Sequence, residues 1–122
     1  MIDTNSIKEI HQFINENGLM PTISLFFGPG AKVQMPFSAS VYAAEIEKLD
    51  LSVRSYNCLK RAGMQTVEQI MDAIHENKLN SIRNLGIKSI GEIRVKILEY
   101  GYSCLSEQKQ LEFIGNMINL NK

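Results

Sequence analysis

The sequence predicts a mainly α-helical protein, in which a compact bundle of four to five helices follows a small module of one helix and a β-hairpin. Three observations predict this fold class. Apolar residues recur at helical spacing near both ends of the sequence, in Ile7–Ile14 and Leu111–Ile118. Capping residues and glycines stand where the intervening helices would begin and end. An apolar fraction of 44% and a charged fraction of 21% suit a globular protein.

Residues 1–45 are expected to form an N-terminal module. A helix is predicted over Ser6–Asn17, capped by its first serine and ended by the glycine that follows. Two β-prone runs, Thr22–Phe27 and Lys32–Phe37, flank the turn sequence Gly28-Pro29-Gly30. They predict a β-hairpin, which needs cover from other parts of the protein because a lone hairpin is marginal in water.

Residues 46–104 are expected to form the bundle, with a final helix in residues 105–122 packing on it. Ser52 and Thr66 each precede a helical segment, and Gln69 completes a capping box with Thr66. Ser38 or Ser40 can cap a short helix at the joint between the two parts. The predicted helices span Val41–Glu47, Val53–Arg61, Thr66 to about Glu76, Lys78–Arg83, Lys88–Glu99 and Ser106 to about Asn119.

The net charge of zero conceals a local positive charge. Residues 1–45 carry two cations and four anions, whereas residues 46–122 carry eleven cations and nine anions. From Lys78 to Lys96 there are five cations and one anion. Such a patch favours a small, weak contact with DNA over strong non-specific binding.

A block from Asn84 to Ile93 has the pattern of a helix-hairpin-helix motif. An apolar residue, Gly86, Lys88 and Ser89 stand where one short helix would turn into another. The glycine permits a positive φ and a close approach of the backbone, and the amides of residues 87–90 would lie at a helix start without acceptors. All of these features favour an anionic oxygen such as a DNA phosphate. The alternative is a tight-turn glycine beside a solvated lysine.

A second block, Val53–Lys60, carries Arg54 and Asn57 three residues apart, so that they share a helix face. Arginine suits the narrow, negative minor groove of A·T-rich DNA, and asparagine can bond base edges or sugars. The alternative is that Arg54 pairs with Asp50 and that Asn57 points to water.

Together the two blocks resemble the C-terminal domain of the bacterial RNA polymerase alpha subunit, over roughly residues 46–104. The resemblance implies a bundle of four helices after an irregular first turn. It also implies binding of A·T-rich DNA upstream of promoters and docking on sigma factors and activators. The family's DNA-contacting positions are all present in this sequence, as Arg54, Asn57, Gly86, Lys88, Ser89 and Glu92.

Two features depart from the family. The acidic pair that often precedes the first helix is here Lys48 and Asp50, and the segment Ala73–Lys78 is about one residue longer than in some relatives. Asp50 and Tyr56, an aromatic that we expect to be exposed on the first helix, are candidate contacts for a protein partner.

We expect a non-catalytic, transcription-associated DNA-binding protein that acts without a polymerase-assembly domain, since only 45 residues precede the family-like part. Arg54 would enter the minor groove of A·T-rich promoter DNA, Lys88 and the Ser89 amide would hold phosphate, and Glu92 would orient Arg54 or Lys88. RNA polymerase, a sigma factor or a regulator are further candidate partners. The sequence starts without a signal peptide and lacks a membrane span of about 20 residues, so a cytoplasmic location is expected.

Two other functions stay open. The domain could be a protein-interaction module that mimics the alpha C-terminal surface to bind a sigma factor or regulators, or a helix-hairpin-helix accessory of a DNA-repair or mobile-element protein. A steep salt dependence separates DNA binding from the former, and structure-specific binding marks the latter.

Catalytic, metal and cofactor chemistry are not expected. His11 and His75 have no cysteine or carboxylate at ligand spacing, and no phosphate-binding loop of the Walker type is present. Cys58 and Cys104 are expected to be free thiols.

Overall fold

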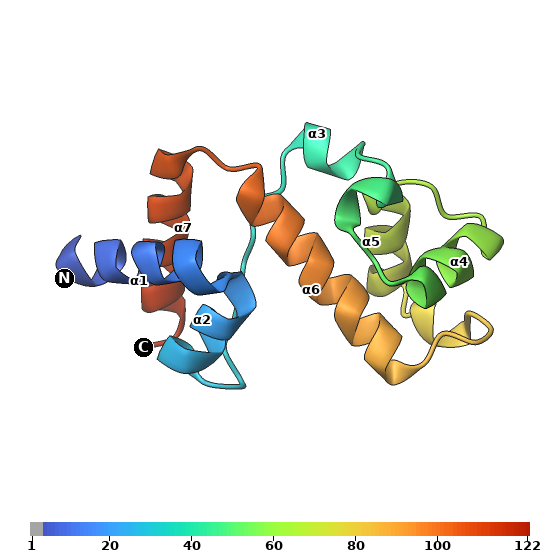
Figure 1. Ribbon diagram of the computed structural model, residues 1–122, viewed down its shortest axis with the longest axis horizontal. Helices are drawn as coiled ribbons and strands as arrows, with labels where there is room; N and C mark the ends of the chain where they lie inside the picture. Colours follow the sequence, from blue (N-terminus) through green and yellow to red (C-terminus); the bar gives the residue numbers. More distant parts are fainter. Residues whose placement is uncertain (1–3) are drawn as a thin grey trace. The chain divides into compact units, whose positions relative to one another are not determined.

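The computed structural model describes residues 4–122, whose regular structure is entirely helical (Figure 1). The mainly α-helical fold class is confirmed. The described residues form seven α-helices and two short 3-10 helices: α1 (Thr4–Asn17), α2 (Leu19–Phe27), α3 (Ala39–Tyr42), η1 (Ile46–Leu49), α4 (Val53–Arg61), α5 (Val67–His75), η2 (Leu79–Ser81), α6 (Ile87–Ser103) and α7 (Glu107–Leu120).

The protein divides into two compact units. The first unit contains the described residues up to Pro36 together with residues 101–122, and the second contains residues 37–100. The first unit therefore consists of two segments that are far apart in the sequence. Helix α7, which follows the bundle in the sequence, belongs to this first unit.

The second unit is built around one apolar core. Backbone hydrogen bonds from Ile46 N–H to Gln65 O (3.0 Å) and from Val67 N–H to Ala44 O (2.9 Å) tie its first segment to the start of α5. Every helix of this unit contributes buried side chains to the core: Val41, Ile46, Leu49, Cys58, Leu59, Val67, Ile70, Ala73, Leu79, Leu85, Ile93 and Ile97.

The caps expected at Ser52 and Thr66 are confirmed, whereas the cap expected at Ser6 is wrong, because Ser6 lies inside α1. The Ser52 and Ser106 hydroxyls accept backbone N–H groups at the starts of α4 and α7. Thr66 and Gln69 form the expected capping box at α5. Ser38 caps α3 by accepting the Val41 N–H. Each cap satisfies amides that would otherwise lack an acceptor, so local chemistry alone fixes these boundaries.

The expected β-hairpin is wrong, because its first run, Thr22–Phe27, lies in helix α2. Leu19, Thr22 and Ile23 are buried at helical spacing, and the Thr22 hydroxyl donates to the Gly18 carbonyl at 2.7 Å. The ring of Phe26 meets the ring of Phe13 on α1 edge-to-face at 5.5 Å. Burial of this helical stripe outweighs the β propensity of the individual residues.

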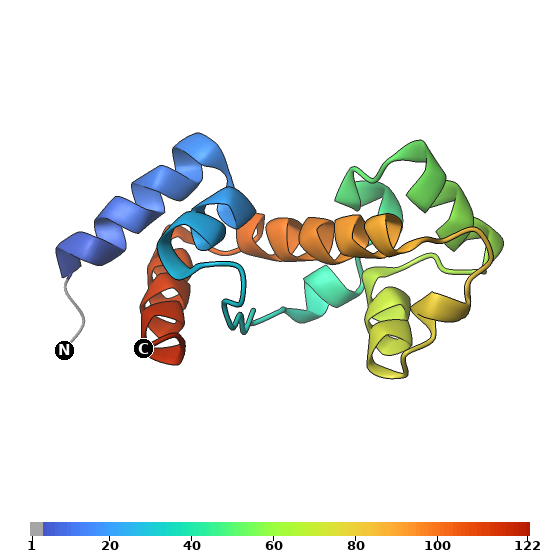
Figure 2. The ribbon, with the colours of Figure 1, turned by 90° about the horizontal axis from the view of Figure 1, so that it is seen from below.

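The second run of the expected hairpin, Lys32–Phe37, has no regular structure (Figure 2). Its side chains still alternate between half-buried and exposed, as in a strand. In place of a partner strand, the Asn121 side chain accepts from Lys32 N–H at 2.7 Å and donates to Lys32 O at 2.9 Å. One amide thus satisfies both backbone groups of Lys32.

Four predicted helix bounds also need correction. Helix α1 starts at Thr4, before the expected cap Ser6. The expected helix Val41–Glu47 is split into α3 and η1, because Glu45 is extended and bridges to Thr66. Left-handed residues Asn77 and Asn84 bracket the expected helix Lys78–Arg83 and leave room only for η2.

The fourth bound is the end of α6, which continues to Ser103 instead of ending near Glu99. Its final turn carries Gly101 and Tyr102, which are both buried. The Tyr102 ring packs edge-to-face on Phe113 of α7 at 5.8 Å. This burial extends the helix past the point where Tyr100-Gly101 predicts its end.

The first unit packs α1, α2 and α7 around a smaller apolar core. His11 Nε2 and Gln110 Oε1 lie 2.9 Å apart, which links α1 to α7. The buried apolar side chains of this unit include Ile10, Ile14, Leu19, Ile23, Phe113, Ile114 and Met117. Among the described residues, no helix combines the length and apolar character needed to cross a bilayer.

The core of the second unit gives a matched test of the fold. Ile93 is fully buried, whereas Ile87, on the same helix, is 89% exposed. Ile93→Ala should lower the free energy of unfolding by about 2–5 kcal/mol, because it removes packed methylene groups and leaves a cavity. Ile87→Ala should change it by less than about 0.5 kcal/mol. Urea unfolding followed by circular dichroism measures both, and equal effects would contradict this packing.

Candidate nucleic-acid interface

A carboxylate on α6 joins that helix to the start of α4. Glu92 Oε2 accepts the Ser52 backbone N–H at 2.9 Å. Glu92 Oε1 accepts the Ser52 and Ser55 hydroxyls, at 2.9 and 2.5 Å. We call this set of three residues the Glu92 clamp. It places the first turn of α4 beside the second turn of α6.

The Glu92 clamp explains a buried polar residue in α4. Ser55 is fully buried, and a hydroxyl in that position needs a hydrogen-bond partner. The hydrogen bond from Ser55, together with those from Ser52, lowers the pKa of Glu92. A negative charge at the start of α4 is also favoured by the helix dipole. Glu92 is thus held ionised at neutral pH.

A second contact joins the middle of α4 to the loop before α6. The Cys58 thiol donates to the Asn84 carbonyl, with a sulfur–oxygen distance of 3.6 Å. Asn84 has a φ of 67°, so this asparagine, and not Gly86, is the left-handed residue of the turn. Gly86 does not adopt the positive φ that a glycine permits at this turn. A Cβ atom on Gly86 would meet no other atom within 4 Å.

The start of α6 presents unpaired backbone amides, as the sequence predicts, but three of them instead of the four expected over residues 87–90. Ile90 N–H donates to Gly86 O at 3.0 Å, so its amide is not available. Within the described part of the protein, the amides of Ile87, Lys88 and Ser89 have no hydrogen-bond acceptor. Three N–H groups and the Lys88 charge therefore lie together at one helix end, an arrangement that favours an anion.

Arg54 and Asn57 lie on the exposed surface of α4. Neither has a hydrogen bond or an ion pair within residues 4–122. Arg54 does not pair with Asp50, whose carboxylate instead lies 3.9 Å from the Lys96 ammonium. Lys88 is likewise exposed and unpaired, and Ser89 is half-buried.

Glu92 does not contact Arg54 or Lys88, although the sequence suggests that it orients one of them. Its two oxygens are occupied by Ser52 and Ser55. Its effect on Arg54 passes through the backbone of α4, whose start it fixes. In the same way it fixes the position of the α6 start relative to Arg54 and Asn57.

Tyr56 is half-buried rather than exposed as expected, because it belongs to a separate polar cluster. Its hydroxyl donates to Glu47 Oε2 at 2.7 Å, and the Lys60 ammonium lies 2.9 Å from the same oxygen. Lys60 and then Tyr56 lower the pKa of Glu47 to about 2. Asp50, by contrast, has a side chain that is 98% exposed.

Sequence reasoning missed Ser52 and Ser55 as residues of this site. Ser52 carries a recognisable signal, since it precedes α4 as its cap. Ser55 carries none, because a serine inside a helix usually points to solvent or bonds its own backbone. Only the approach of Glu92, 37 residues later in the sequence, gives the hydroxyl its partner.

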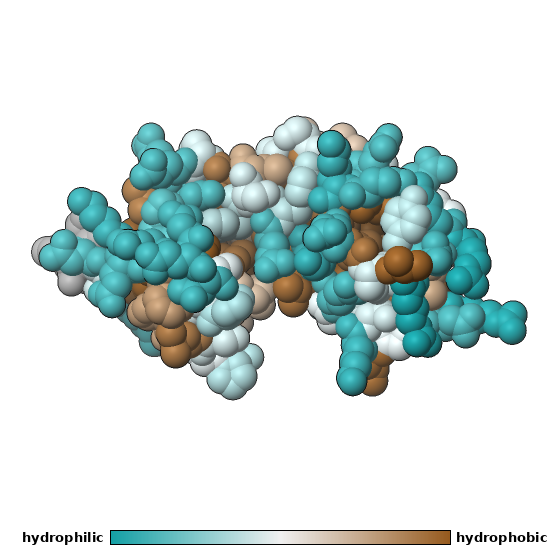
Figure 3. All heavy atoms as spheres, viewed as in Figure 1, coloured by the Kyte–Doolittle hydropathy of each residue, from teal (hydrophilic) through white to brown (hydrophobic). Residues whose placement is uncertain are grey.

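The surface around these residues is hydrophilic. On the face seen in Figure 3, hydrophilic residues cover most of α4, whereas the start of α6 shows white and brown residues beside hydrophilic ones. The hydrophobic residues Val53 and Ile87 have exposed fractions of 76% and 89%. No group of three or more histidine, cysteine or acidic side chains that could hold a metal ion occurs in residues 4–122. The exposed cations and free amides suit recognition of an anion.

Comparisons with known proteins agree on one family. Residues 37–99 match the family model of the C-terminal domain of the bacterial RNA polymerase alpha subunit. A DNA-directed RNA polymerase subunit alpha of Rubrobacter xylanophilus is 57% identical over 58 residues, which cover 48% of this protein and 18% of the relative. That of a Roseiflexus species is 53% identical over 64 residues, 52% of this protein and 20% of the relative. The match thus spans about a fifth of the length of these curated relatives, and no solved structure matches significantly.

The Glu92 clamp makes stability depend on pH in a defined direction. Hydrogen bonding lowers the pKa of Glu92 in the folded protein below its usual 4.5. Its contribution is therefore complete above about pH 4.5 and is lost as the pH falls through the lower folded value. Glu92→Gln should reduce the free energy of unfolding by about 1–3 kcal/mol at pH 7, and by progressively less in acid.

Urea unfolding of both proteins from pH 7 down to pH 3 measures this difference. Glu68→Gln, which neutralises an exposed carboxylate without a hydrogen bond in residues 4–122, is the control. A difference between wild type and Glu92→Gln that stays constant with pH would argue against the clamp.

Proposed function

The protein belongs to the family of the bacterial RNA polymerase alpha C-terminal domain, and on that premise we propose that its second unit binds the minor groove of A·T-rich promoter DNA. This domain of the polymerase is non-catalytic. The proposed role is therefore recognition: the unit marks a DNA site for transcription.

One observation carries the proposal: two exposed polar side chains without internal partners stand beside a helix start with unpaired amides. Arg54 and Asn57 share the outer face of α4, and Lys88 and Ser89 begin α6. The Glu92 clamp holds the two elements in one geometry before any ligand binds. Preorganisation of this kind reduces the entropy cost of binding.

The proposed contacts follow from the chemistry of each group. The Arg54 guanidinium enters the narrow groove, where the negative potential of an A·T tract is strongest, and Asn57 bonds base edges or sugars. Lys88 and the free amides up to Ser89 hold one phosphate. Glu92 is a positioning residue, and its negative charge faces the serines instead of the phosphate.

Gly86 contributes to the proposed contact because it has no side chain. No Cβ atom stands between the turn and an approaching backbone, so a phosphate can come close to the amides of α6. The exposed apolar residues Val53 and Ile87, each the first residue of its helix, can lie against deoxyribose surfaces at the edge of the same contact.

A second candidate function is a contact with a polymerase component, a sigma factor or a transcription regulator. The ordered cluster of Tyr56, Glu47 and Lys60 favours it, because it presents a defined aromatic and charged surface next to the proposed DNA contact. The exposed carboxylate of Asp50 would extend that surface. Protein binding through these residues does not require the steep salt dependence that phosphate contacts impose.

Arg54→Ala should weaken binding to an A·T-tract duplex about tenfold or more, because it removes the side chain proposed to enter the groove. Fluorescence anisotropy with an A·T-tract duplex and a G·C-rich duplex, at low and moderate salt, measures this. The wild type should prefer the A·T tract.

The control is Arg94→Ala, an exposed arginine of α6 that lines a groove with Phe37 and Met71 instead of facing α4. Arg94→Ala removes the same charge as Arg54→Ala, and the variant should retain most of the affinity for the A·T-tract duplex. If neither duplex binds the wild type at low salt, the DNA function is wrong, and sigma factors and regulators become the partners to test.

Gly86→Ala should separate binding from folding. A Cβ atom at this position meets nothing within 4 Å in the free protein, so the free energy of unfolding should stay within about 0.5 kcal/mol of wild type. The same methyl group would stand between the turn and a bound phosphate and should weaken DNA binding several-fold. Gly30→Ala, also in open space but in the first unit, is the control. Unchanged binding in Gly86→Ala would mean that the backbone does not approach DNA here.

A further inference from the structure

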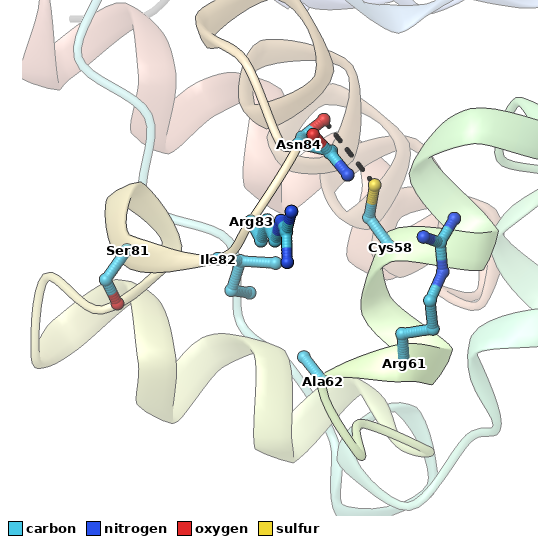
Figure 4. Close-up of a pocket in the computed structure, with 7 residues that line it drawn as sticks. All are labelled: Cys58, Arg61, Ala62, Ser81, Ile82, Arg83 and Asn84. Carbon is cyan, nitrogen blue, oxygen red and sulfur yellow. Dashed lines mark hydrogen bonds between the residues drawn. The ribbon is translucent and has the colours of Figure 1, made fainter.

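A basic groove lies between the end of α4 and the segment that leads into α6. Its volume is about 640 Å³. Arg61 comes from the last turn of α4, and Arg83 comes from the facing segment 81–84 (Figure 4). Cys58 and Asn84 close the groove between them. The function proposed above does not use this groove.

The charge of the basic groove is uncompensated. Arg61 and Arg83 are both exposed, and neither has a carboxylate within ion-pair distance in residues 4–122. No residue that lines the groove is acidic. The helix dipole of α4 favours a cation such as Arg61 at its C-terminal end, but it does not stabilise a second cation, Arg83, on the opposite wall. Two guanidinium groups facing one space favour an anion that accepts hydrogen bonds from both.

The other polar groups of the groove already have internal partners. The Cys58 thiol donates to Asn84 O, as the dashed line in Figure 4 marks, and the Ser81 hydroxyl donates to Lys78 O at 2.7 Å. What remains for a ligand is the pair of guanidinium groups and the Asn84 side chain. These are donors suited to phosphate oxygens, and they offer little to an apolar ligand.

Both walls of the basic groove continue the elements that carry the proposed DNA contact. Arg54, Asn57 and Arg61 recur at intervals of three and four residues, which places them on one stripe along α4. On the other wall, Arg83 and Asn84 lead directly into the turn at Gly86. An anion in the groove would therefore lie on the same surface as a DNA duplex bound there.

We propose that the basic groove binds a second phosphate of the same duplex, on the strand across the minor groove from the phosphate held at the start of α6. The inference rests on the proposed function and extends it. Seven residues of helix separate Arg54 from Arg61, a rise of about 10 Å. The minor groove is about 6 Å wide, so the separation is large enough for Arg54 to lie inside it while Arg61 contacts a flanking backbone. The domain then spans the groove and contacts both strands.

The test is the salt dependence of binding by Arg61→Gln, Arg83→Gln and the double variant. Each phosphate contact contributes about 0.9 to the slope of log K against log salt. On an A·T-tract duplex, the double variant should lose about 1 from the wild-type slope and bind about tenfold more weakly at low salt. Lys78→Gln removes a charge outside the groove, one that is paired with Glu76 at 2.6 Å, and should keep the wild-type slope. Circular dichroism checks that all variants are folded.

A second measurement identifies the strand. Duplexes with neutral methylphosphonates on one strand or the other should each lower the wild-type slope. For the double variant, the duplex that is neutral on the strand held by the basic groove should leave the slope unchanged, because the contact with that strand is already lost. The other should still lower its slope, through the phosphate held by Lys88.

The outcomes distinguish this inference from the proposed function. If the wild type binds the A·T tract and the double variant keeps its slope, the groove does not hold phosphate, although the DNA function stands. If the wild type binds no duplex, both are wrong. If the double variant keeps the slope but loses binding of an acidic poly-glutamate peptide, the groove serves a protein partner, and the inference is overturned.

Discussion

The candidate interface depends on one carboxylate. Glu92 accepts three hydrogen bonds from Ser52 and Ser55, and through them it joins the start of α4 to the second turn of α6. Without this contact, the residues proposed to bind DNA would stand on two helices with no polar connection at that end. The carboxylate points to the serines and not outward. A negatively charged residue therefore lies within a surface whose other groups favour an anion.

A second contact fixes the other end of the same arrangement. The Cys58 thiol bonds the carbonyl of the left-handed residue Asn84, which sets the path of the backbone into α6. Between these two contacts α4 lies alongside the turn, and its outer face carries Arg54, Asn57 and Arg61. The free amides of α6 and the basic groove therefore occupy fixed positions in the free protein.

How far the sequence predicts this structure depends on the range of the interactions involved. The capping box of Thr66 and Gln69 acts within one turn, and its prediction is confirmed. The strand expected over Thr22–Phe27 is wrong, because packing on α1 decides the conformation of this run. For the site, the exposure of Arg54 follows from the pattern, whereas the partner of Ser55 comes from 37 residues away and has no local signal. Long-range pairing is what a single sequence conceals.

The first unit is interrupted by the second, since its two segments are separated by residues 37–100. During synthesis, all residues of the second unit leave the ribosome before α7 does, and domains generally fold as units as they emerge. Helices α1 and α2 must wait for α7 with part of their apolar surface uncovered. Folding of the inserted unit shortens the effective loop between the two segments of the first unit, which lowers the entropy cost of bringing those segments together. A nascent polypeptide arrested before α7 would therefore contain the whole second unit and expose the unfinished core of the first unit, a feature that chaperones and proteases can recognise.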